Sequence, residues 1–327
     1  MGSGQRRDVI LLLTHSGDYF TVDRVAQALD RRGARVFRFD TDRFPGEVKL
    51  SAKFTSSETS HLLEDRGNVL QASEVRAVWA RKFWQPRLAD DLDPTFHDSC
   101  VRESTAAVQG FLDGLNSARW INEPLRDLAA ENKLWQLRIA LEVGLKVPRT
   151  LVTNDPERMR SFFAEVDGQM VAKLLTPLSI SMDGASAFVY TSAVTKADLA
   201  DGEMLRYSPM AFQERIAKAC ELRVAFVDGQ FFTGAIDASG SVRGQVDWRL
   251  SSPDETKWQR TEVPDSLAVA LKTMMAKLGL VYGAIDLIRT PEGEHVFLEV
   301  NPGGEWGMLE RDLDYPISEA IAVALLH

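Results

Sequence analysis

Residues 282–302 read YGAIDLIRTPEGEHVFLEVNP, which is typical of two strands joined by a turn at 291–294. Glu299 and Asn301 stand two positions apart, so both side chains point to one face of a strand. If the two strands pair as a hairpin, Asp286 can lie on that same face. Two carboxylates and an amide oxygen at one place are ligands that suit Mg²⁺. The pattern therefore predicts a magnesium site, with solvent-facing polar residues at the strand ends as the alternative.

Two lysines upstream of this stretch are candidates for binding an anion. Lys173 lies in a predicted strand at 170–174 whose other members are apolar, where a charged side chain usually needs an anionic partner. Lys133 lies near the start of a predicted helix at 131–143. The sequence also allows another interpretation of each lysine. Lys173 can be an edge residue whose side chain reaches solvent, and Lys133 can be a solvent-exposed residue at the start of a helix.

A third group of polar residues lies where the chain leaves a predicted strand that begins at Met210. Backbone N–H and C=O groups here can form hydrogen bonds with the edge of a purine, and Glu221 can accept hydrogen bonds from ribose hydroxyls. The segment consists of Gln213, Glu214, Arg215 and Ile216. Arg223 stands on the next strand. The planar guanidinium group of Arg249, in a predicted loop, suits phosphate or carboxylate, with an exposed loop arginine as the alternative. The alternative is that the alternating charged residues only form the solvent-exposed face of a strand.

The beginning of the chain predicts a parallel α/β lobe. Residues 9–13, VILLL, read as a strand, and apolar residues within 22–29 follow the spacing of one helix face. A second strand is predicted at 34–39, after Gly33, which suits a helix end. Strand, helix and strand in this order predict a right-handed parallel unit. A strand at 75–80, a helix near 97–117 and a strand at 119–122 would complete the lobe.

The rest of the chain predicts antiparallel strands with a few helices. Two strands, 222–227 and 230–236, flank Asp228-Gly229, which favours a two-residue hairpin turn. A helix is predicted at 265–278, ending at Gly279. The fold class is therefore α/β at the start and α+β afterwards, in about three lobes.

Composition excludes several classes of protein. The chain has 327 residues, 45% hydrophobic and 26% charged, and its net charge is −9, so it is not a disordered protein and lacks the basic character of sequence-independent nucleic-acid binders. No apolar run approaches the roughly 20 residues needed to cross a membrane. The two cysteines lie far apart, which predicts reduced thiols and a cytoplasmic protein. Neither a dinucleotide fingerprint nor a P-loop is present.

Taken in order, the candidate residues resemble those of an ATP-grasp ligase. The stretches 13–18, LTHSGD, and 37–45, FRFDTDRFP, look like the ATP-grasp maturases of ribosomally made peptides, the microviridin-type or graspetide macrocyclases. This resemblance implies a three-lobed ATP-grasp fold with an N-terminal parallel α/β lobe. The implied lobes are an N-terminal lobe at 1–123, a central lobe at 124–207 and a C-terminal lobe at 208–327, with ATP between the last two.

The resemblance also implies a role for each candidate residue. Lys133 and Lys173 would contact ATP phosphates, the segment from Gln213 to Ile216 would line the adenine site, and Glu221 would hold the ribose. Asp286, Glu299 and Asn301 would hold two Mg²⁺ ions, while Arg223 and Arg249 would steady the γ-phosphate and an acyl-phosphate. The segment at 176–185 departs from the family pattern, because its only glycine is Gly184. Phosphate contacts there would come from Ser179 or Ser181 instead.

The activity that the resemblance implies is the joining of Asp or Glu side chains of a precursor peptide, which has a leader and a core, to Thr or Ser hydroxyls or Lys amines. Homodimers are common in enzymes of this kind, and no nucleic-acid or membrane partner is expected. Two other functions stay open on the sequence: an ATP-grasp ligase that adds a free amino acid to a small acid or protein tail, and a non-catalytic nucleotide- or peptide-binding module.

Overall fold

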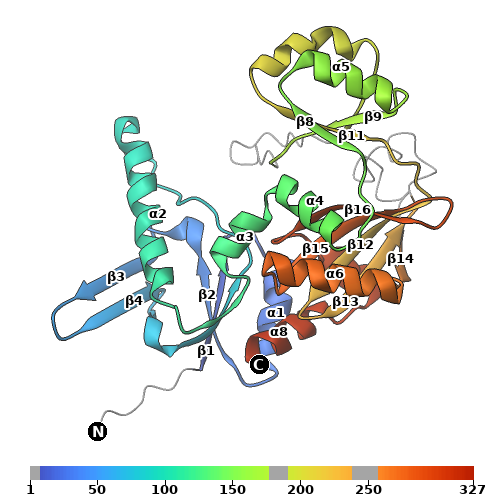
Figure 1. Cartoon of the computed structure of the whole chain (residues 1–327). Coiled ribbons are helices and arrows are strands. Elements are labelled where there is room, and N and C mark those ends of the chain that lie inside the picture. The colour runs from blue at the N-terminus through green and yellow to red at the C-terminus, as the bar shows by residue number, and fades with distance from the viewer. Residues whose placement is uncertain (1–7, 177–190, 238–256) are drawn as a thin grey trace. The chain divides into compact units, whose positions relative to one another are not determined.

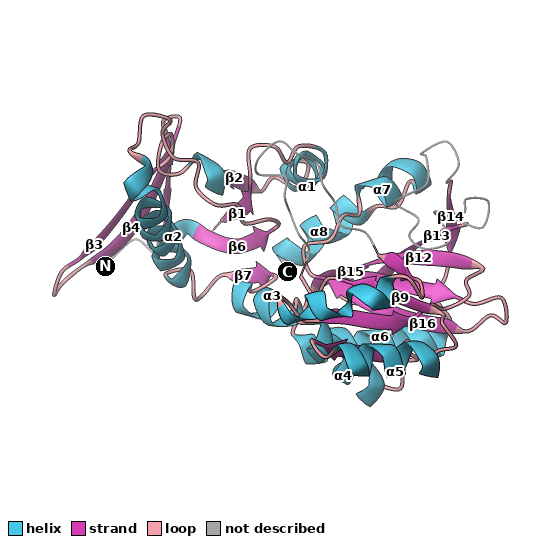
Figure 2. Cartoon of the chain, turned by 90° about the horizontal axis from the view of Figure 1, so that it is seen from above, coloured by secondary structure: helices cyan, strands magenta, loops and turns pink. Residues whose placement is uncertain are grey.

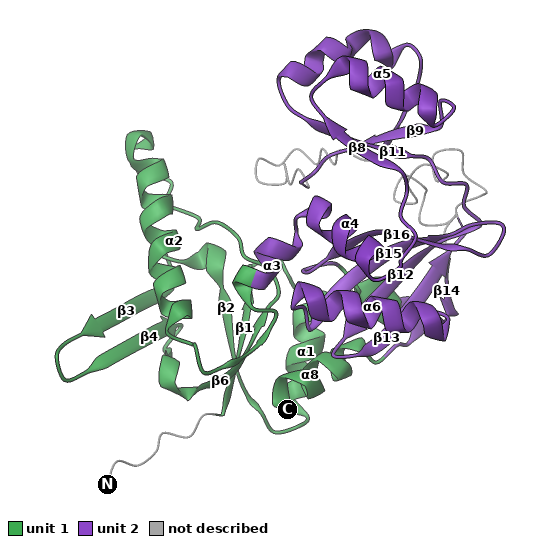
Figure 3. Ribbon diagram, in the orientation of Figure 1, with its two compact units in different colours: residues 1–125, 305–310, 316–327 green, residues 126–304, 311–315 purple. Residues whose placement is uncertain are grey.

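The computed structural model describes residues 8–176, 191–237 and 257–327 (Figure 1). Two expectations lie outside these ranges: the segment at 176–185 beyond Thr176, and Arg249. The chain divides into two compact units (Figure 3). Unit 1 comprises residues 1–125, 305–310 and 316–327, and unit 2 comprises residues 126–304 and 311–315.

Unit 1 contains the parallel sheet that the N-terminal sequence predicts, with strand order β2-β1-β6-β7. Its strands are β1 (Val9–Thr14), β2 (Arg35–Asp40), β6 (Val75–Ala80) and β7 (Arg119–Ile121). Its helices are α1 (Phe20–Asp30), α2 (His97–Asp113) and α8 (Ile317–Leu326), and α7 (Gly307–Leu313) precedes α8. Figure 1 shows the sheet between α2 on one side and α1 and α8 on the other. Gly33 has a φ of +73°, as expected just beyond the end of α1.

A second sheet in unit 1 was not predicted from the sequence. It is antiparallel, in the order β3-β4-β5. Its strands are β3 (Lys49–Phe54), β4 (Thr59–Asp65) and β5 (Asn68–Gln71). Only Leu63 and Leu70 of these strands are buried, so the apolar alternation that signals a strand is weak here. Short 3₁₀ helices connect these elements at Thr41–Arg43, Ala72–Glu74 and Pro94–Phe96.

Unit 2 contains two antiparallel sheets. The first has the order β10-β9-β11-β8, and α5 (Pro156–Glu165) and the 3₁₀ helix η5 (Asp198–Arg206) pack on it. Its strands are β8 (Thr150–Thr153), β9 (Met170–Lys173), β10 (Ser192–Val194) and β11 (Met210–Glu214). The second sheet has the order β14-β13-β12-β15-β16. Its strands are β12 (Cys220–Val227), β13 (Gln230–Ile236), β14 (Trp258–Thr261), β15 (Tyr282–Arg289) and β16 (His295–Asn301).

Helices cover one face of the five-stranded sheet, and the other face carries charged residues among buried apolar ones such as Phe232 and Ile236. Three helices stand before or between its strands: α3 (Pro124–Ala130), α4 (Lys133–Glu142) and α6 (Asp265–Leu278). Figure 2 shows α4 and α6 on the same side of β12, β15 and β16, where they share one apolar core with these strands. The predicted turn at Asp228-Gly229 is confirmed, because both residues have the positive φ that a two-residue hairpin turn needs.

Two further expectations concern the cysteines and membrane-spanning segments. Cys100 and Cys220 are both free thiols, as predicted. In the parts of the chain that the structure describes, no helix is long and apolar enough to cross a membrane.

Candidate functional site

Three charged residues form a row across the five-stranded sheet. Arg223 on β12 lies opposite Asp286 on β15, and Asp286 lies opposite Glu299 on β16. Directly opposed residues of antiparallel strands point to the same face. Their chain neighbours Leu222 and Ile285 point to the other face and belong to the core. The hairpin of β15 and β16 expected from the sequence is therefore observed, with Asp286 and Glu299 side by side.

Arg223 binds Asp286 through both carboxylate oxygens. One terminal guanidinium nitrogen (Nη1) of Arg223 donates to Oδ1 and Oδ2 of Asp286, each at 2.7 Å. Burial by itself acts to lower the pKa of Arg223, but the charge and hydrogen bonds of Asp286 outweigh it, so that the pKa is raised. The arginine therefore stays charged in a largely buried position, facing the carboxylates of the row.

Lys133 approaches the same row from helix α4. Its Nζ is 2.9 Å from Oε2 of Glu299 and donates to the backbone C=O of Leu174 at 3.3 Å. The position is fixed by Asn132, whose side chain accepts hydrogen bonds from two backbone N–H groups and so caps the helix directly before Lys133. Lys133 is thus an ion-pair partner of Glu299 rather than a solvated helix start.

Asn301 completes the set of candidate metal ligands. Its side-chain Nδ2 lies 3.4 Å from Oδ2 of Asp286 and 3.4 Å from Oε1 of Glu299. Two carboxylates and an amide therefore converge on one point, and rotation of the amide would turn its oxygen toward that point. These donors fit a hard cation such as Mg²⁺. Among the described residues no group of three His, Cys, Asp or Glu side chains is placed to hold a metal, which agrees with a set that contains only two carboxylates.

A β-bulge shapes this end of β16. The register passes from Asp286 opposite Glu299 to Leu287 opposite Phe297, so Leu298 is the additional residue. Leu298 and Glu299 both line one pocket although they are consecutive in the chain, which a regular strand would not allow. Alternation read from the sequence cannot predict this.

The pocket lies between the two sheets of unit 2. Lys173 on β9 and Gln213 on β11 line it together with Lys133 and Glu299. Gln213 is 6% exposed, and its Nε2 donates to Oγ1 of Thr150 at 3.1 Å. Most of the other lining residues are apolar, as in pockets that bind flat rings, but the open volume is only about 20 Å³, so the pocket would have to widen to admit a ring. They are Leu134, Leu137, Val152, Leu174, Leu175, Ala211 and Leu298, none of which carries a sequence signal that would identify it as part of a site.

The segment after β11 presents little of its polar surface to a ligand. The Glu214 carboxylate accepts two hydrogen bonds from Arg149, at 3.0 and 3.1 Å, and these bonds lower its pKa. The backbone N–H groups of Glu214 and Arg215 donate to the carbonyl oxygens of Arg149 and Gln169. In the described part of the chain, the backbone N–H of Ile216 donates to no protein acceptor. Of the predicted adenine segment, Ile216 is therefore the residue whose N–H is available.

Glu221 has a partner that the sequence reasoning missed. Lys218 donates to its carboxylate at 2.6 Å, and both side chains are largely buried. A lysine three residues before a glutamate is the signal that could have indicated this pair. Neither residue lines the pocket, and Arg249 lies outside the described residues.

The chain is similar to several known proteins. Residues 9–127 match the model of the MvdD pre-ATP grasp domain. Macrocyclase MdnB from Microcystis aeruginosa MRC is 51% identical, covers 98% of this chain and 99% of its own, and has a TM-score of 0.84. Macrocyclase MdnC from the same organism, solved with its precursor peptide MdnA, is 36% identical, with 97% and 99% covered and a TM-score of 0.87.

A third structure is a RiPP-associated ATP-grasp ligase from Chryseobacterium gregarium, solved with ADP and a leader and core peptide. It is 31% identical, covers 98% of this chain and 96% of its own, and has a TM-score of 0.89. A comparison with curated proteins gave no significant match.

Proposed function

The chain belongs to the ATP-grasp macrocyclase family, and on that premise we propose that it is an ATP-dependent ligase that closes rings in a ribosomally made precursor peptide. The reaction activates an Asp or Glu side chain of the peptide as an acyl-phosphate and joins it to a Thr or Ser hydroxyl or to a Lys amine. We divide the chain for this purpose into an N-terminal lobe at 1–123, a central lobe at 124–207 and a C-terminal lobe at 208–327, with ATP between the last two.

The observation that carries the proposal is the row of Arg223, Asp286 and Glu299, with Lys133 against its end. Without ligand, the two carboxylates are neutralised by an arginine and a lysine. Asp286 and Glu299 would hold the cations, and Lys133 and Arg223 would then be released to contact the phosphates of a nucleotide. A site whose carboxylates and basic side chains can separate in this way is suited to bind metal and polyphosphate together.

The nucleotide would occupy the pocket between the two sheets. Lys133 and Lys173 lie on its wall and would contact phosphate oxygens, and the N–H of Ile216 would donate to the adenine edge. Glu221 would accept from the ribose hydroxyls once it parts from Lys218. Asp286, Glu299 and Asn301 would hold two Mg²⁺ ions, which supply positive charge against the phosphates.

The chain's other residues would position the reacting groups. The peptide carboxylate attacks the γ-phosphorus of ATP, ADP leaves, and an acyl-phosphate forms. Arg223, and with it Arg249, would hold the negative oxygens of this group. A hydroxyl or amine of the same peptide then attacks the carbonyl carbon and expels phosphate. Because nucleophile and electrophile belong to one bound peptide, proximity favours ring closure over attack by water.

The partner of the enzyme is then a precursor peptide with a leader and a core. In two of the solved relatives the enzyme is bound to such a peptide, and in one of them ADP is present as well. We include a homodimer in the proposal as the assembly to be tested by size-exclusion chromatography with light scattering.

The test is the intact mass of the precursor peptide encoded beside the gene, after co-expression with the enzyme. We expect the mass to fall by one water per ring, with a loss that needs ATP and disappears in the Glu299→Gln variant. Reversal by mild base indicates esters and resistance indicates amides. ADP release with a free amino acid, and no mass change in the peptide, would instead make the chain a ligase of another substrate.

A further inference from the structure

A buried side chain on helix α4 binds the backbone of the strand that carries two of the candidate metal ligands. Gln136 is 2% exposed, and its amide oxygen accepts a hydrogen bond from the N–H of Val300 at 2.8 Å. Its amide nitrogen donates to the C=O of Val300 at 2.7 Å and to the C=O of Ala130, the last residue of α3, at 2.6 Å. A glutamine amide has two N–H donors and one oxygen acceptor. Both donors and the oxygen of Gln136 are therefore bonded to backbone.

Val300 stands between Glu299 and Asn301 on β16. Its side chain belongs to the apolar core, on the face of the sheet opposite to its two neighbours. Among the described strands, β16 has only β15 as a neighbour. In an antiparallel pair the N–H and C=O of every second residue point away from the neighbouring strand. At Val300 these two groups meet Gln136, whose amide takes the place of a further strand and fixes the backbone from which both ligands extend.

The pairing of β16 with β15 is irregular close to this point. The β-bulge places Leu298 outside the register directly before Glu299. A bulge disrupts the ladder and bends the strand that contains it. Gln136 adds two hydrogen bonds two residues beyond Leu298. The course of this end of β16 therefore depends on α4 as well as on β15.

The same face of α4 carries Lys133. Residues three apart are neighbours on a helix surface, and Lys133 contacts Glu299 while Gln136 contacts the next residue, Val300. Two links of different kinds thus join helix and strand. The ion pair would separate when a cation takes the carboxylate. The amide of Gln136 carries no net charge and is bonded only to backbone, so neither metal nor phosphate competes for it.

We propose that Gln136 is a positioning residue of the magnesium site, which holds the ligands Glu299 and Asn301 in place. It does so while the ion pair of Lys133 opens to admit metal and nucleotide. Gln136 itself touches neither of them and acts through the backbone of Val300. The identity of the metal rests on the proposed function. Without this link the two ligands must be ordered when the cation binds, and that cost weakens metal binding.

The test replaces Gln136 by Met, which keeps the size of the side chain and removes all three hydrogen bonds. Binding of ADP to the full-length protein is measured by isothermal titration calorimetry, in excess Mg²⁺ and again in EDTA. Mg²⁺ should raise the ADP affinity of the wild-type protein, and in Gln136→Met this gain should be about ten-fold smaller, with the affinity in EDTA unchanged. A gain as large as in the wild-type protein would overturn the proposal. So would a wild-type affinity that does not depend on Mg²⁺.

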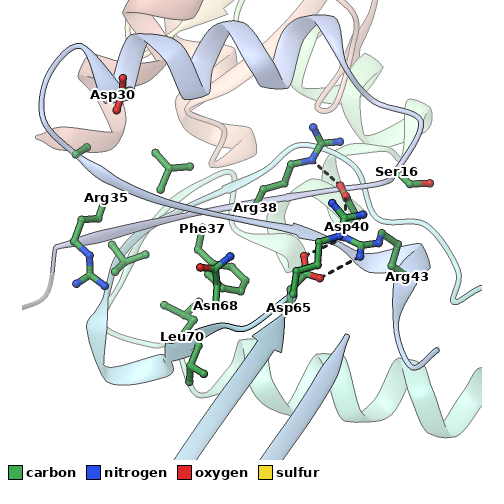
Figure 4. Close-up of a pocket in the computed structure, with 15 residues that line it drawn as sticks. Ser16, Asp30, Arg35, Phe37, Arg38, Asp40, Arg43, Asp65, Asn68 and Leu70 are labelled. Carbon is green, nitrogen blue, oxygen red and sulfur yellow. Dashed lines mark hydrogen bonds and ion pairs between the residues drawn. The ribbon is translucent and has the colours of Figure 1, made fainter. Parts of the chain in front are cut away.

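Two control variants separate positioning from a general loss of stability. Leu271→Ala removes apolar contacts in the core of unit 2 from helix α6, which carries none of the candidate site residues. Arg43→Met breaks a comparable two-point link in unit 1, where Arg43 donates to both carboxylate oxygens of Asp65 at 3.0 and 3.1 Å (Figure 4). Both controls should lower the urea midpoint and keep the wild-type gain from Mg²⁺. If Leu271→Ala loses that gain as Gln136→Met does, Gln136 acts only through stability and the proposal fails.

Hydrogen exchange of the wild-type protein tests the link without any variant. In peptides that span residues 299–301, we expect the N–H of Val300 to exchange slowly before ligand is added, because its acceptor is buried. It should stay as slow when Mg²⁺ and ADP bind. Fast exchange at the start, or faster exchange on binding, would mean that the link opens with the ion pair and would contradict the proposal.

These measurements need no turnover, so they can be separated from the test of ring closure. A wild-type protein that closes rings, together with an unchanged Mg²⁺ gain in Gln136→Met, would refute this inference alone. A protein that closes no rings but loses the Mg²⁺ gain in Gln136→Met would refute the proposed function alone.

Discussion

Replacement of Glu299 by Gln removes one negative charge and keeps the size of the side chain. In the wild-type protein the Glu299 carboxylate is 2.9 Å from the Lys133 ammonium and within 3.4 Å of the Asn301 amide. The variant therefore loses one of the two carboxylates proposed to hold Mg²⁺. It also leaves Lys133 with neutral acceptors in place of an ion pair, since the carbonyl of Leu174 and the amide oxygen of the new side chain carry no charge. We expect ATP consumption to fall sharply while the fold and the peptide affinity persist.

The size of the effect follows from the geometry. Two unit charges about 3 Å apart attract each other by about 6 kcal/mol at an effective dielectric constant of about 20. The side chains of Lys133 and Glu299 are 27% and 18% exposed, so water offsets part of this attraction. If about half remains, and if the Glu299 carboxylate makes a contact of that strength with Mg²⁺ in the transition state instead, the loss of that contact costs about 3 kcal/mol, which slows the reaction roughly 100-fold.

The assay is release of ADP in the presence of the precursor peptide. The control is Glu294→Gln, the same substitution in the turn of the same hairpin, where Glu294 pairs with Lys146 and does not line the pocket. The control should keep the wild-type rate. A Glu299→Gln enzyme that keeps a third or more of wild-type turnover would refute the metal assignment, and so would an equal loss in the control.

Four other outcomes are expected. Arg223→Lys keeps the charge but removes the planar guanidinium group that would hold the acyl-phosphate, so ADP release should fall about ten-fold; full activity would show that this group is not needed. Chelation of divalent cations by EDTA should stop ADP release and leave the circular dichroism spectrum unchanged, with recovery on adding Mg²⁺; loss of helical signal would instead indicate a structural metal. His15 is buried and stacked on Trp84, and burial lowers its pKa below 6.5. As the pH falls through 6.5, His15 is therefore protonated in the unfolded chain before it is protonated in the folded protein, and the folded protein loses stability. The urea midpoint should thus be lower at about pH 5.5 than at about pH 7.5. In the His15→Phe variant this difference between the two midpoints should be smaller. Gly279 has a φ of +72°, and Gly279→Ala should destabilise the protein by about 1 kcal/mol in urea unfolding, whereas no change would mean that the backbone relaxes there.

Most of the regular elements could be predicted because strand and helix periods are properties of the local chain. The strands at 75–80 and 230–236 and the helix at 265–278 have the predicted bounds. Their apolar residues repeat with the period that the backbone imposes, and turn residues mark their ends. The sheet of β3, β4 and β5 could not be found in this way, because few of its side chains are buried and the pattern carries little signal.

The same distinction between local pattern and tertiary packing applies to the candidate site. The sequence by itself predicted which residues carry the chemistry, because Asp286, Glu299 and Asn301 interrupt apolar strands at positions where a polar group needs a partner. Only the tertiary structure decided what those partners are: Lys133 for Glu299 and Arg223 for Asp286. These pairs depend on how distant segments pack and on strand register, which no local spacing encodes. The link from Gln136 to the backbone of Val300 is a property of the same kind, since it joins residues 164 positions apart in the chain.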